Sequence, residues 1–203
     1  MSYDISLIDP KTNKVVLMKD SILVRGGTVP AEYDRVTGEL RHAAQREARI
    51  NITYNYGKYY YEATDGDERF AHSEISCYYA DGTTGPIRTE YGIRGLYGKT
   101  GAESVSLLGD MIVKIKQKYT DDDGNWLTDK RSKVIYYDEH GNEVDHLNIY
   151  FGYIKVTEKK IEYEVSEGDT DNYWEPTAAS AIKALEQMLF MALEYPNAIW
   201  NGD

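Results

Sequence analysis

Residues 92–108, GIRGLYGKTGAESVSLL, carry closely spaced glycines, an arginine and the start of a helix. Thr100 and Glu103 stand three residues apart ahead of an apolar run, which is the pattern of a capping box. The N–H groups at a helix start attract anions, and Arg94 lies just upstream. The stretch therefore predicts an amphipathic helix from Gly101 with an anion-binding corner at its start. Its apolar face is expected to carry Val105, Leu108, Met111, Ile112 and Ile115.

A capping box accounts for Thr100 and Glu103 without any ligand, because each side chain satisfies the backbone N–H of the other residue. The prediction of a binding site therefore depends on Arg94, on Tyr97 and on the glycines around them.

A second amphipathic helix is predicted over residues 178–195. Thr177 is a suitable N-cap for it, and Pro196 ends it. The aromatic tail Ile199–Asp203 is expected to dock back onto the fold. The apolar stripe predicted for this helix is Ile182, Leu185, Leu189 and Leu193, with Met188 and Ala192 adding to its width.

Runs rich in Ile, Thr and Tyr predict strands ahead of the two helices. Tyr3–Ile8 and Lys14–Met18 are predicted to form a hairpin across the turn signal Asp9-Pro10. Ile50–Tyr61 is the strongest strand in the sequence, and Glu74–Tyr79 is a further one.

Residues Lys133–Val165 are predicted to form a three-stranded meander, with Leu147–Val156 as its second strand and a turn at Glu158–Lys160. The sequence as a whole predicts an α+β fold in one domain, an antiparallel sheet followed by two helices. Residues 59–90 and 118–169 are expected to be β-rich insertions into it.

The composition excludes some classes of protein. A net charge of −11 disfavours direct binding to a nucleic-acid backbone, which needs a basic surface. The single cysteine excludes an internal disulfide. The sequence has no apolar run of membrane-spanning length, and the first residues, MSYDISLIDP, resemble a strand rather than a signal peptide. We therefore expect a cytoplasmic protein that does not enter a membrane.

Nineteen tyrosines against three phenylalanines suit a sheet with one wet face. They also suit an oligomer interface or a pocket that stacks bases, and the sequence leaves these three interpretations open.

Motifs for catalysis are not found. The chain has no nucleophile elbow, Walker loop, dinucleotide fingerprint or zinc-protease helix, and its four histidines have no evident partners. Residues 121–125, DDDGN, resemble the opening of a calcium loop, but the glycine falls at the fourth position and the closing glutamate is missing. We expect a polar hairpin tip there, and no enzyme activity, metal site or cofactor in this protein.

Ligand binding has more support than catalysis. Arg25 and Arg94 suit phosphate groups. The helix starts at Thr100 and Thr177 suit an anion, and aromatic residues such as Tyr97 and Trp174 suit a stacked base. Thr53 and Asn55 would line a polar strand face. The predicted ligand-binding residues are Arg25, Thr53, Asn55, Arg94, Tyr97, Thr100, Trp174 and Thr177.

Several blocks of the sequence together resemble a family of small phage and prophage accessory proteins. Members of this family are shorter, and the extra residues here fall in 59–90 and 118–169. The blocks are MSYDISLIDP at the start, RGGT at Arg25–Thr28, NITYNY at Asn51–Tyr56, GIRGLYGKTGAES at Gly92–Ser104, YWEPT at Tyr173–Thr177 and IWNGD at Ile199–Asp203.

The resemblance implies a phage-encoded protein. The predicted sheet with two helices is also similar in architecture to the Thoeris anti-defence sponge proteins, which sequester cyclic ADP-ribose-type or cyclic oligonucleotide signals in oligomers. The leading hypothesis is a non-catalytic counter-defence protein that binds a nucleotide-type small molecule as a homo-oligomer. An acidic inhibitor or nucleic-acid mimic that acts on a host nuclease or CRISPR effector is the alternative, and a structural or host-takeover component without a ligand is a third.

Overall fold

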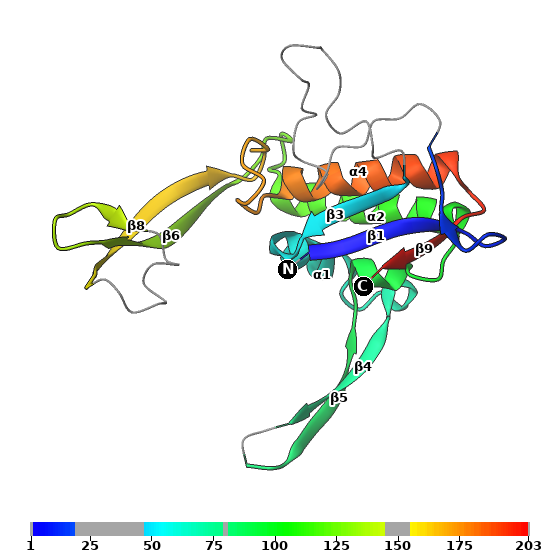
Figure 1. The fold of residues 1–203 in the computed structure, drawn as a ribbon, viewed down its shortest axis with the longest axis horizontal. Coiled ribbons are helices and arrows are strands. Elements are labelled where there is room, and N and C mark those ends of the chain that lie inside the picture. Colours follow the sequence, from blue (N-terminus) through cyan, green and yellow to red (C-terminus); the bar gives the residue numbers. More distant parts are fainter. Residues whose placement is uncertain (1, 19–46, 79–80, 145–154, 203) are drawn as a thin grey trace, which may run out of the picture.

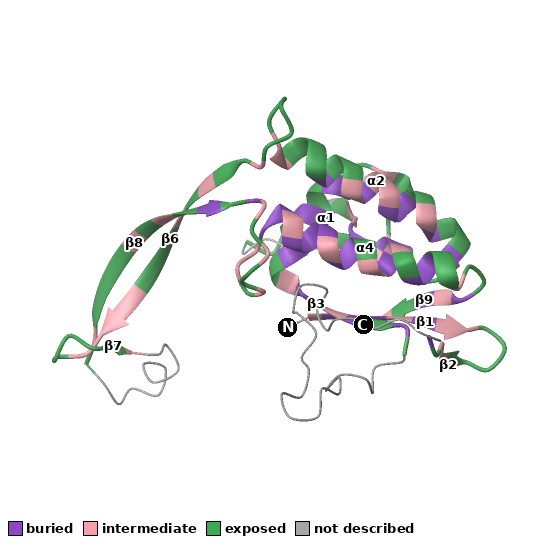
Figure 2. Cartoon of the chain, turned by 90° about the horizontal axis from the view of Figure 1, so that it is seen from above, coloured by how far each residue is buried: buried purple, intermediate pink, exposed green. Residues whose placement is uncertain are grey.

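The structure is a computed structural model that describes residues 2–18, 47–78, 81–144 and 155–202. An antiparallel sheet is covered on one face by helices, and two β-hairpins project from this body (Figure 1, Figure 2). The α+β fold that the sequence predicts is therefore confirmed. Arg25 and the RGGT block lie outside the described residues.

The sheet is built around its first strand. This strand pairs antiparallel with three others, β3 and β9 lying on opposite edges of it. Its alternate residues Tyr3, Ile5 and Leu7 are buried and the residues between them are half-exposed, as in a sheet with one packed face. The predicted hairpin at Asp9-Pro10 is confirmed. The strands are β1 (Ser2–Asp9), β2 (Lys14–Val15), β3 (Arg49–Thr53) and β9 (Ile199–Gly202).

The C-terminal tail docks onto the sheet as expected. Trp200 on β9 is 1% exposed, and its indole N–H donates a hydrogen bond of 2.7 Å to the hydroxyl of Ser104. This bond satisfies the one polar group of the buried ring, so the tail closes the core between the sheet and the helix that carries Ser104.

Two long helices, α2 (Gly101–Tyr119) and α4 (Ala178–Glu194), pack against each other and over the sheet (Figure 2). Leu108, Met111 and Ile115 of α2 are buried as predicted. Met188 and Ala192 of α4 are buried as predicted, but the prediction for Leu193 is wrong: its side chain is 61% exposed, because the buried face is turned toward Met191. No helix among the described residues is long and apolar enough to cross a membrane.

The strand predicted over residues 50–61 is wrong beyond Thr53, where β3 ends. The chain continues as a short 3-10 helix, η1 (Tyr54–Tyr56), and then as α1 (Gly57–Thr64). The buried residues Tyr56, Tyr59, Tyr60 and Ala63 recur at the spacing of one helix face. Tertiary packing of that face outweighs the strand propensity of tyrosine and threonine. Residues 59–64 of the first predicted insertion therefore belong to the core.

The shorter projecting hairpin follows α1 and a second 3-10 helix, η2 (Glu68–Phe70). Its strands are β4 (Ser73–Tyr78), within one residue of the prediction, and β5 (Thr84–Glu90). A third 3-10 helix, η3 (Ile93–Leu96), leads from it to α2.

The longer projecting hairpin lies between α2 and α4 in the chain. It pairs β6 (Thr128–Tyr137) with β8 (Thr157–Ser166), and β7 (Glu143–Val144) pairs with the far end of β6. The turn predicted at Glu158–Lys160 is wrong because these residues lie within β8, where charged side chains suit an exposed edge strand. Residues 147–154 of the predicted second strand lie outside the described part of the chain.

The calcium-like residues 121–125 form a tight polar turn between α2 and β6. The carboxylate of Asp121 accepts hydrogen bonds from the backbone N–H groups of Asp123 and Asn125, at 3.1 and 2.7 Å. Gly124 has a φ of +82°, a conformation that suits glycine. The carboxylate thus holds its own turn, as expected for a hairpin tip.

Asp67 joins η2 to α2, and its substitution should show a distinctive pH dependence. Hydrogen bonds from Arg69 at 2.7 and 2.9 Å, together with one from Lys114 at 3.3 Å, hold the pKa of Asp67 well below its ordinary value. A carboxylate whose pKa is lower in the folded state stabilises the fold above its unfolded pKa, and this contribution is lost as the pH falls.

Asp67→Asn is therefore expected to lower the melting temperature at pH 7, and the gap to the wild type should narrow as the pH falls below about 4. Asp122→Asn, in the exposed 121–125 turn, is the matched control. Thermal melts across this pH range measure the gap, and a gap for Asp67→Asn that is as large at pH 3 as at pH 7 would contradict the assignment.

Candidate functional site

Arg94 lies on η3 between two glycines that close packing requires. Gly92 has a φ of +123°, and a Cβ atom there would lie 2.9 Å from the ring of Tyr61. A Cβ atom on Gly95 would lie 2.2 Å from the carbonyl oxygen of Phe70. These glycines let η3 lie flat against η2 and α1, and this position fixes where the guanidinium of Arg94 points.

The guanidinium of Arg94 lies over two tyrosine rings. Its Cζ atom is 5.1 Å from the ring centre of Tyr3 and 5.5 Å from that of Tyr54, within the range of cation–π contacts. It also donates a hydrogen bond of 2.9 Å to the hydroxyl of Tyr54. Burial opposes the charge on Arg94, but the nearby hydroxyls of Tyr54, Tyr3, Tyr97 and Tyr61 outweigh it, and the pKa of Arg94 is raised.

An exposed tryptophan is tied to the same place. The side-chain amide of Asn55 donates to the backbone carbonyl of Trp174 at 3.2 Å, and Asn55 follows Tyr54 in the chain. Trp174 packs edge-on against Tyr173 and remains 69% exposed. We call the group of Tyr3, Tyr54, Asn55, Arg94 and Trp174 the Arg94 surface.

Thr53 and Tyr97 support this surface rather than face solvent. Thr53 is 3% exposed, and its hydroxyl caps η1 by accepting from the N–H of Asn55. The predicted direct role of Thr53 is therefore corrected to a structural one. Tyr97 is half-buried, and its hydroxyl lies so close to Gly202 that a Cβ atom there would be 2.5 Å away.

The start of α2 has the predicted capping box, but its N–H groups are occupied by the chain itself. Thr100 and Glu103 cap each other, with the Thr100 N–H bonded to the Glu103 carboxylate at 2.8 Å. The N–H groups of Gly101 and Ala102 donate to backbone carbonyls in the 196–198 segment, at 2.8 and 2.9 Å. This corrects the prediction that Thr100 contributes to an anion site.

Thr100→Ala is expected to cost about 1 kcal/mol of stability, because it removes one side of the capping box. Thr100→Ser keeps the hydroxyl and is the matched control, and chemical denaturation measures both. Since the helix start has its donors occupied, neither substitution should change ligand affinity. A loss of ligand binding in Thr100→Ala as large as that in an Arg94 variant would mean that the start of α2 is part of the binding site.

The start of α4 is an anion site that the chain fills with its own carboxylate. Thr177 caps the helix by accepting from the N–H of Ser180 at 3.2 Å. The carboxylate of Glu167, 2% exposed, accepts from the N–H of Ala178 at 2.7 Å, and the backbone carbonyl of Glu167 accepts from Ala179. The prediction that Thr177 helps to bind an external anion is corrected accordingly.

Glu167 is also the centre of a charged cluster that the sequence analysis missed. Its carboxylate accepts from the guanidinium of Arg131 at 3.0 Å and from the hydroxyl of Tyr59 at 2.8 Å. Arg131, at the base of the long hairpin, also pairs with Asp129 and Glu175. Burial, followed by the bond to Glu167, raises the pKa of Tyr59, so this hydroxyl stays a donor. The signal in the sequence is an acidic loop, residues 167–171, ahead of a helix start.

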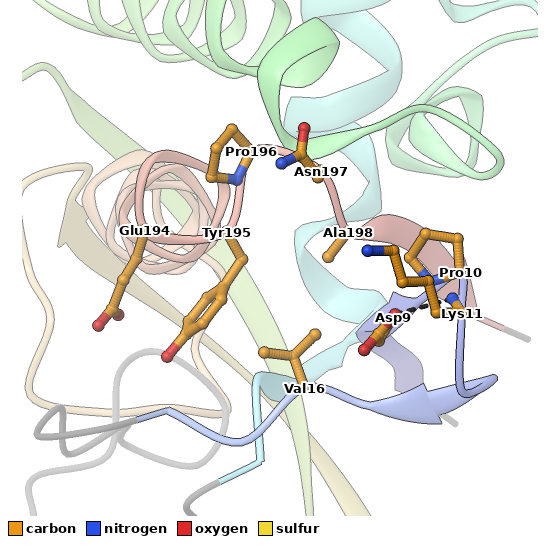
Figure 3. A pocket seen from close by; sticks show the side chains of 9 residues that line it. All are labelled: Asp9, Pro10, Lys11, Val16, Glu194, Tyr195, Pro196, Asn197 and Ala198. Carbon is orange, nitrogen blue, oxygen red and sulfur yellow. Dashed lines mark hydrogen bonds between the residues drawn. The ribbon is translucent and has the colours of Figure 1, made fainter.

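A pocket of about 530 Å³ lies at the far end of β1 from Tyr3. It opens between the β1–β2 turn, with Asp9 and Lys11, and the end of α4, with Glu194 and Tyr195 (Figure 3). The hydroxyl of Tyr195 donates to the carbonyl of Leu17 at 3.2 Å. Asp9 lies six positions after Tyr3 along β1, or about 20 Å of strand, so this pocket is separate from the Arg94 surface.

A second pocket, of about 400 Å³, adjoins the Arg94 surface at Tyr61. It is lined by Tyr61, Glu62, Asp65, Thr89, Glu90 and Tyr91. Its carboxylates accept hydrogen bonds and repel phosphate, so this pocket does not suit a phosphate group.

The sequence-predicted residues thus separate into groups. Asn55, Arg94 and Trp174 meet in one surface, with Thr53 and Tyr97 behind it. Thr100 and Thr177 begin helices whose donors the chain occupies. Comparison with family models, with curated proteins and with solved structures gives no match.

Proposed function

We propose that this chain is a phage-encoded counter-defence protein of the host cytoplasm that binds and sequesters a nucleotide-derived immune signal without turning it over. The signal is of the cyclic ADP-ribose or cyclic oligonucleotide type. The observation that carries the proposal is the Arg94 surface, in which an arginine lies over two phenol rings and Asn55, next to Tyr54 in the chain, bonds the backbone of the exposed Trp174.

The blocks that carry the family resemblance also meet there. Tyr3 comes from MSYDISLIDP, Tyr54 and Asn55 from NITYNY, Arg94 from GIRGLYGKTGAES, and Trp174 from YWEPT. Hydrogen bonds and ring contacts join all of them although they are spread over 172 positions of the chain, from Tyr3 to Trp174. Distant segments that converge on a half-buried arginine and its tyrosines, with an exposed tryptophan in the same group, support a binding site.

Arg94 suits the phosphate of such a ligand. A guanidinium offers several N–H donors in a plane that matches two phosphate oxygens, and in this fold one of them donates to the hydroxyl of Tyr54. The phenol of Tyr54 and the amide of Asn55 add donors at the same edge. Trp174 provides an exposed face on which a base can stack.

The chemistry of these groups supports binding without turnover. Burial, and then the hydrogen bond that Tyr3 donates to Tyr61 at 3.4 Å, raise the pKa of Tyr3, so this hydroxyl stays protonated at neutral pH. Protonated phenols and an arginine donate hydrogen bonds, but they do not act as general bases or nucleophiles.

The test is to incubate the purified chain with cyclic ADP-ribose isomers and cyclic oligonucleotides, measure the thermal shift, and then denature the protein and recover the ligand. An intact ligand and a stabilised protein are expected. Trp174→Leu should weaken binding about tenfold, because stacking of one base contributes about 1–3 kcal/mol. Phe190→Leu, at an exposed aromatic on α4, is the matched control. A chemically altered ligand would indicate an enzyme, and no shift with any signal would refute the proposal.

A second candidate function is inhibition of a host nuclease or CRISPR effector by direct binding. The two projecting hairpins favour it, because they carry exposed apolar side chains such as Ile87, 64% exposed, and Val134, 46% exposed. Mixing with purified effectors tests it: an inhibitory complex lost in Ile87→Ser but kept in Trp174→Leu would support this function and contradict sequestration.

A further inference from the structure

The outer edge of β8 is a long strand edge. Among the residues that the structure describes, β8 lies last in the sheet order β7-β6-β8, and its ten residues from Thr157 to Ser166 pair with β6 along one side. The hairpin projects from the body (Figure 1, Figure 2), and no other described strand pairs with the second side of β8. A strand edge presents backbone donors and acceptors that can pair with a further strand.

The charge pattern along β8 is complementary to the same pattern read in the opposite chain direction. Lys159 and Lys160 precede Ile161, whereas Glu162 and Glu164 follow it. Two copies of the strand that run antiparallel would bring the basic half of each beside the acidic half of the other. Opposite charges on facing positions of neighbouring strands stabilise the pair, and like charges destabilise it.

The register of such a pair follows from these charges. With Ile161 facing Ile161 on the twofold axis, Lys160 faces Glu162 twice and Lys159 faces Tyr163 twice. A centre on Lys160 or on Glu162 would instead place two like charges face to face on the axis. The remaining like-charged pairing, Glu158 with Glu164, is relieved because Glu164 has a cation on its own hairpin, Lys130 at 3.9 Å.

Pairing at this edge would also bring apolar side chains of the two hairpins onto one face of a larger sheet. Ile135 and Tyr137 of β6 lie on the same side of the hairpin as Ile161 and Tyr163 of β8, and all four are half-exposed. A single two-stranded ribbon is only marginally stable in water, whereas a sheet of three or more strands with an apolar face can be stable by itself. Two hairpins joined through β8 give four strands with these side chains on one face, where they alternate with Lys133 and Lys159.

The other long strand of the hairpin does not offer the same match. β6 carries Lys130, Arg131 and Lys133 within four residues, and antiparallel pairing of β6 with itself about Ser132 would set Arg131 against Lys133. Arg131 is also held at the base of the hairpin by Glu167 and Glu175. The charge pattern therefore selects β8.

We propose that the chain forms a twofold-symmetric dimer by antiparallel pairing of β8 with β8 of a second copy, centred on Ile161. The dimer leaves the Arg94 surface of each copy exposed, because β8 and Arg94 belong to different parts of the fold (Figure 1). It is independent of what that surface binds.

A charge-swap series tests the pairing. Sedimentation across micromolar concentrations should find a dimer for the wild type. Lys160→Glu and Glu162→Lys each replace two attractive contacts by repulsive ones and should weaken the dimer about tenfold or more. The double variant restores opposite charges in reversed positions and should recover the dimer. Lys116→Glu, on the exposed side of α2, makes the same change of charge as Lys160→Glu and should have no effect.

A disulfide tests the register. In a Cys77→Ser background, Ile161→Cys should give a covalent dimer under mild oxidation, because facing residues on neighbouring strands lie within disulfide distance. Lys116→Cys should not cross-link. Circular dichroism of each variant checks that the chain is folded.

The outcomes decide the proposal. A dimer that only the single charge reversals weaken, and that the double variant recovers, supports it, as does a cross-link at position 161. A monomeric wild type, or single reversals that stay dimeric, would refute pairing through β8. A dimer with no cross-link at 161 would refute this register. A monomer that binds a host effector through the hairpin would refute the dimer and would mean that the outer edge of β8 binds that effector.

Discussion

Glu167→Ala should destabilise the chain by about 3–5 kcal/mol, because it removes one partner of a buried charge pair. It leaves the guanidinium of Arg131, the hydroxyl of Tyr59 and the first N–H of α4 without the carboxylate that now bonds all three. For a chain of this length, such a loss corresponds to a melting temperature lower by about 10 °C. The base of the long hairpin should also exchange its amide hydrogens faster than the central sheet does.

Glu167→Gln removes the negative charge of the side chain but keeps its shape. An amide oxygen can still accept from Tyr59 and from the helix start, but it does not balance Arg131, so an intermediate loss is expected. Glu139→Gln, at a carboxylate whose side chain is 75% exposed, is the control and should change little. A shift of 2 °C in the melting temperature corresponds to at most about 1 kcal/mol in a chain of this length. A Glu167→Ala chain that melts within 2 °C of the wild type would therefore contradict a structural role for this cluster.

Gly95→Ala should cost about 3 kcal/mol, at the upper end of overpacking substitutions. The added Cβ atom would lie 2.2 Å from the carbonyl oxygen and 2.5 Å from the Cα atom of Phe70, and backbone atoms cannot rotate away as a side chain can. η2 and η3 must separate, and Arg94, the residue before Gly95, moves with η3. Ligand affinity should therefore fall together with stability.

Gly98→Ala is the informative comparison for Gly95→Ala. Gly98 has a φ of +81° but open space around its Cα, so alanine there costs only the left-handed conformation, about 1–2 kcal/mol. Urea denaturation of both variants measures the difference. A Gly95→Ala variant as stable as Gly98→Ala would mean that the contact between η3 and Phe70 is loose.

The helices could be predicted from the sequence because their signals are local. Thr100 with Glu103 and Thr177 with Pro196 mark ends, and the apolar spacing of α2 gives its buried face. α1 was not predictable in the same way. Its tyrosines favour strands by propensity, and the helical spacing of Tyr56, Tyr59 and Tyr60 becomes decisive only once their common burial is known.

The candidate site was predictable in part. Arg94 and Tyr97 stood out because helix capping did not explain them; Arg94 lies in the Arg94 surface, whereas the hydroxyl of Tyr97 packs against Gly202. The N–H groups at the helix starts of Thr100 and Thr177 attract negatively charged groups, which is why the sequence predicted anion sites there. For the same reason, carbonyls and a carboxylate of the chain itself occupy these N–H groups. The partners that fill them, the 196–198 carbonyls and Glu167, are distant in sequence or unmarked, so local patterns could not reveal them.

Calorimetric titration of the chain with the signal that gives the largest thermal shift tests the central claim most directly. The comparison is between the wild type and Arg94→Lys, which keeps the charge but loses the planar donors. Arg49→Lys, at a half-exposed arginine on β3, is the matched control. If the Arg94 surface binds the phosphate of a nucleotide-type signal, Arg94→Lys should weaken affinity about ten- to a hundredfold, as expected for a lost hydrogen bond to a charged group, and Arg49→Lys should not. Equal affinities for the wild type and Arg94→Lys would contradict the account.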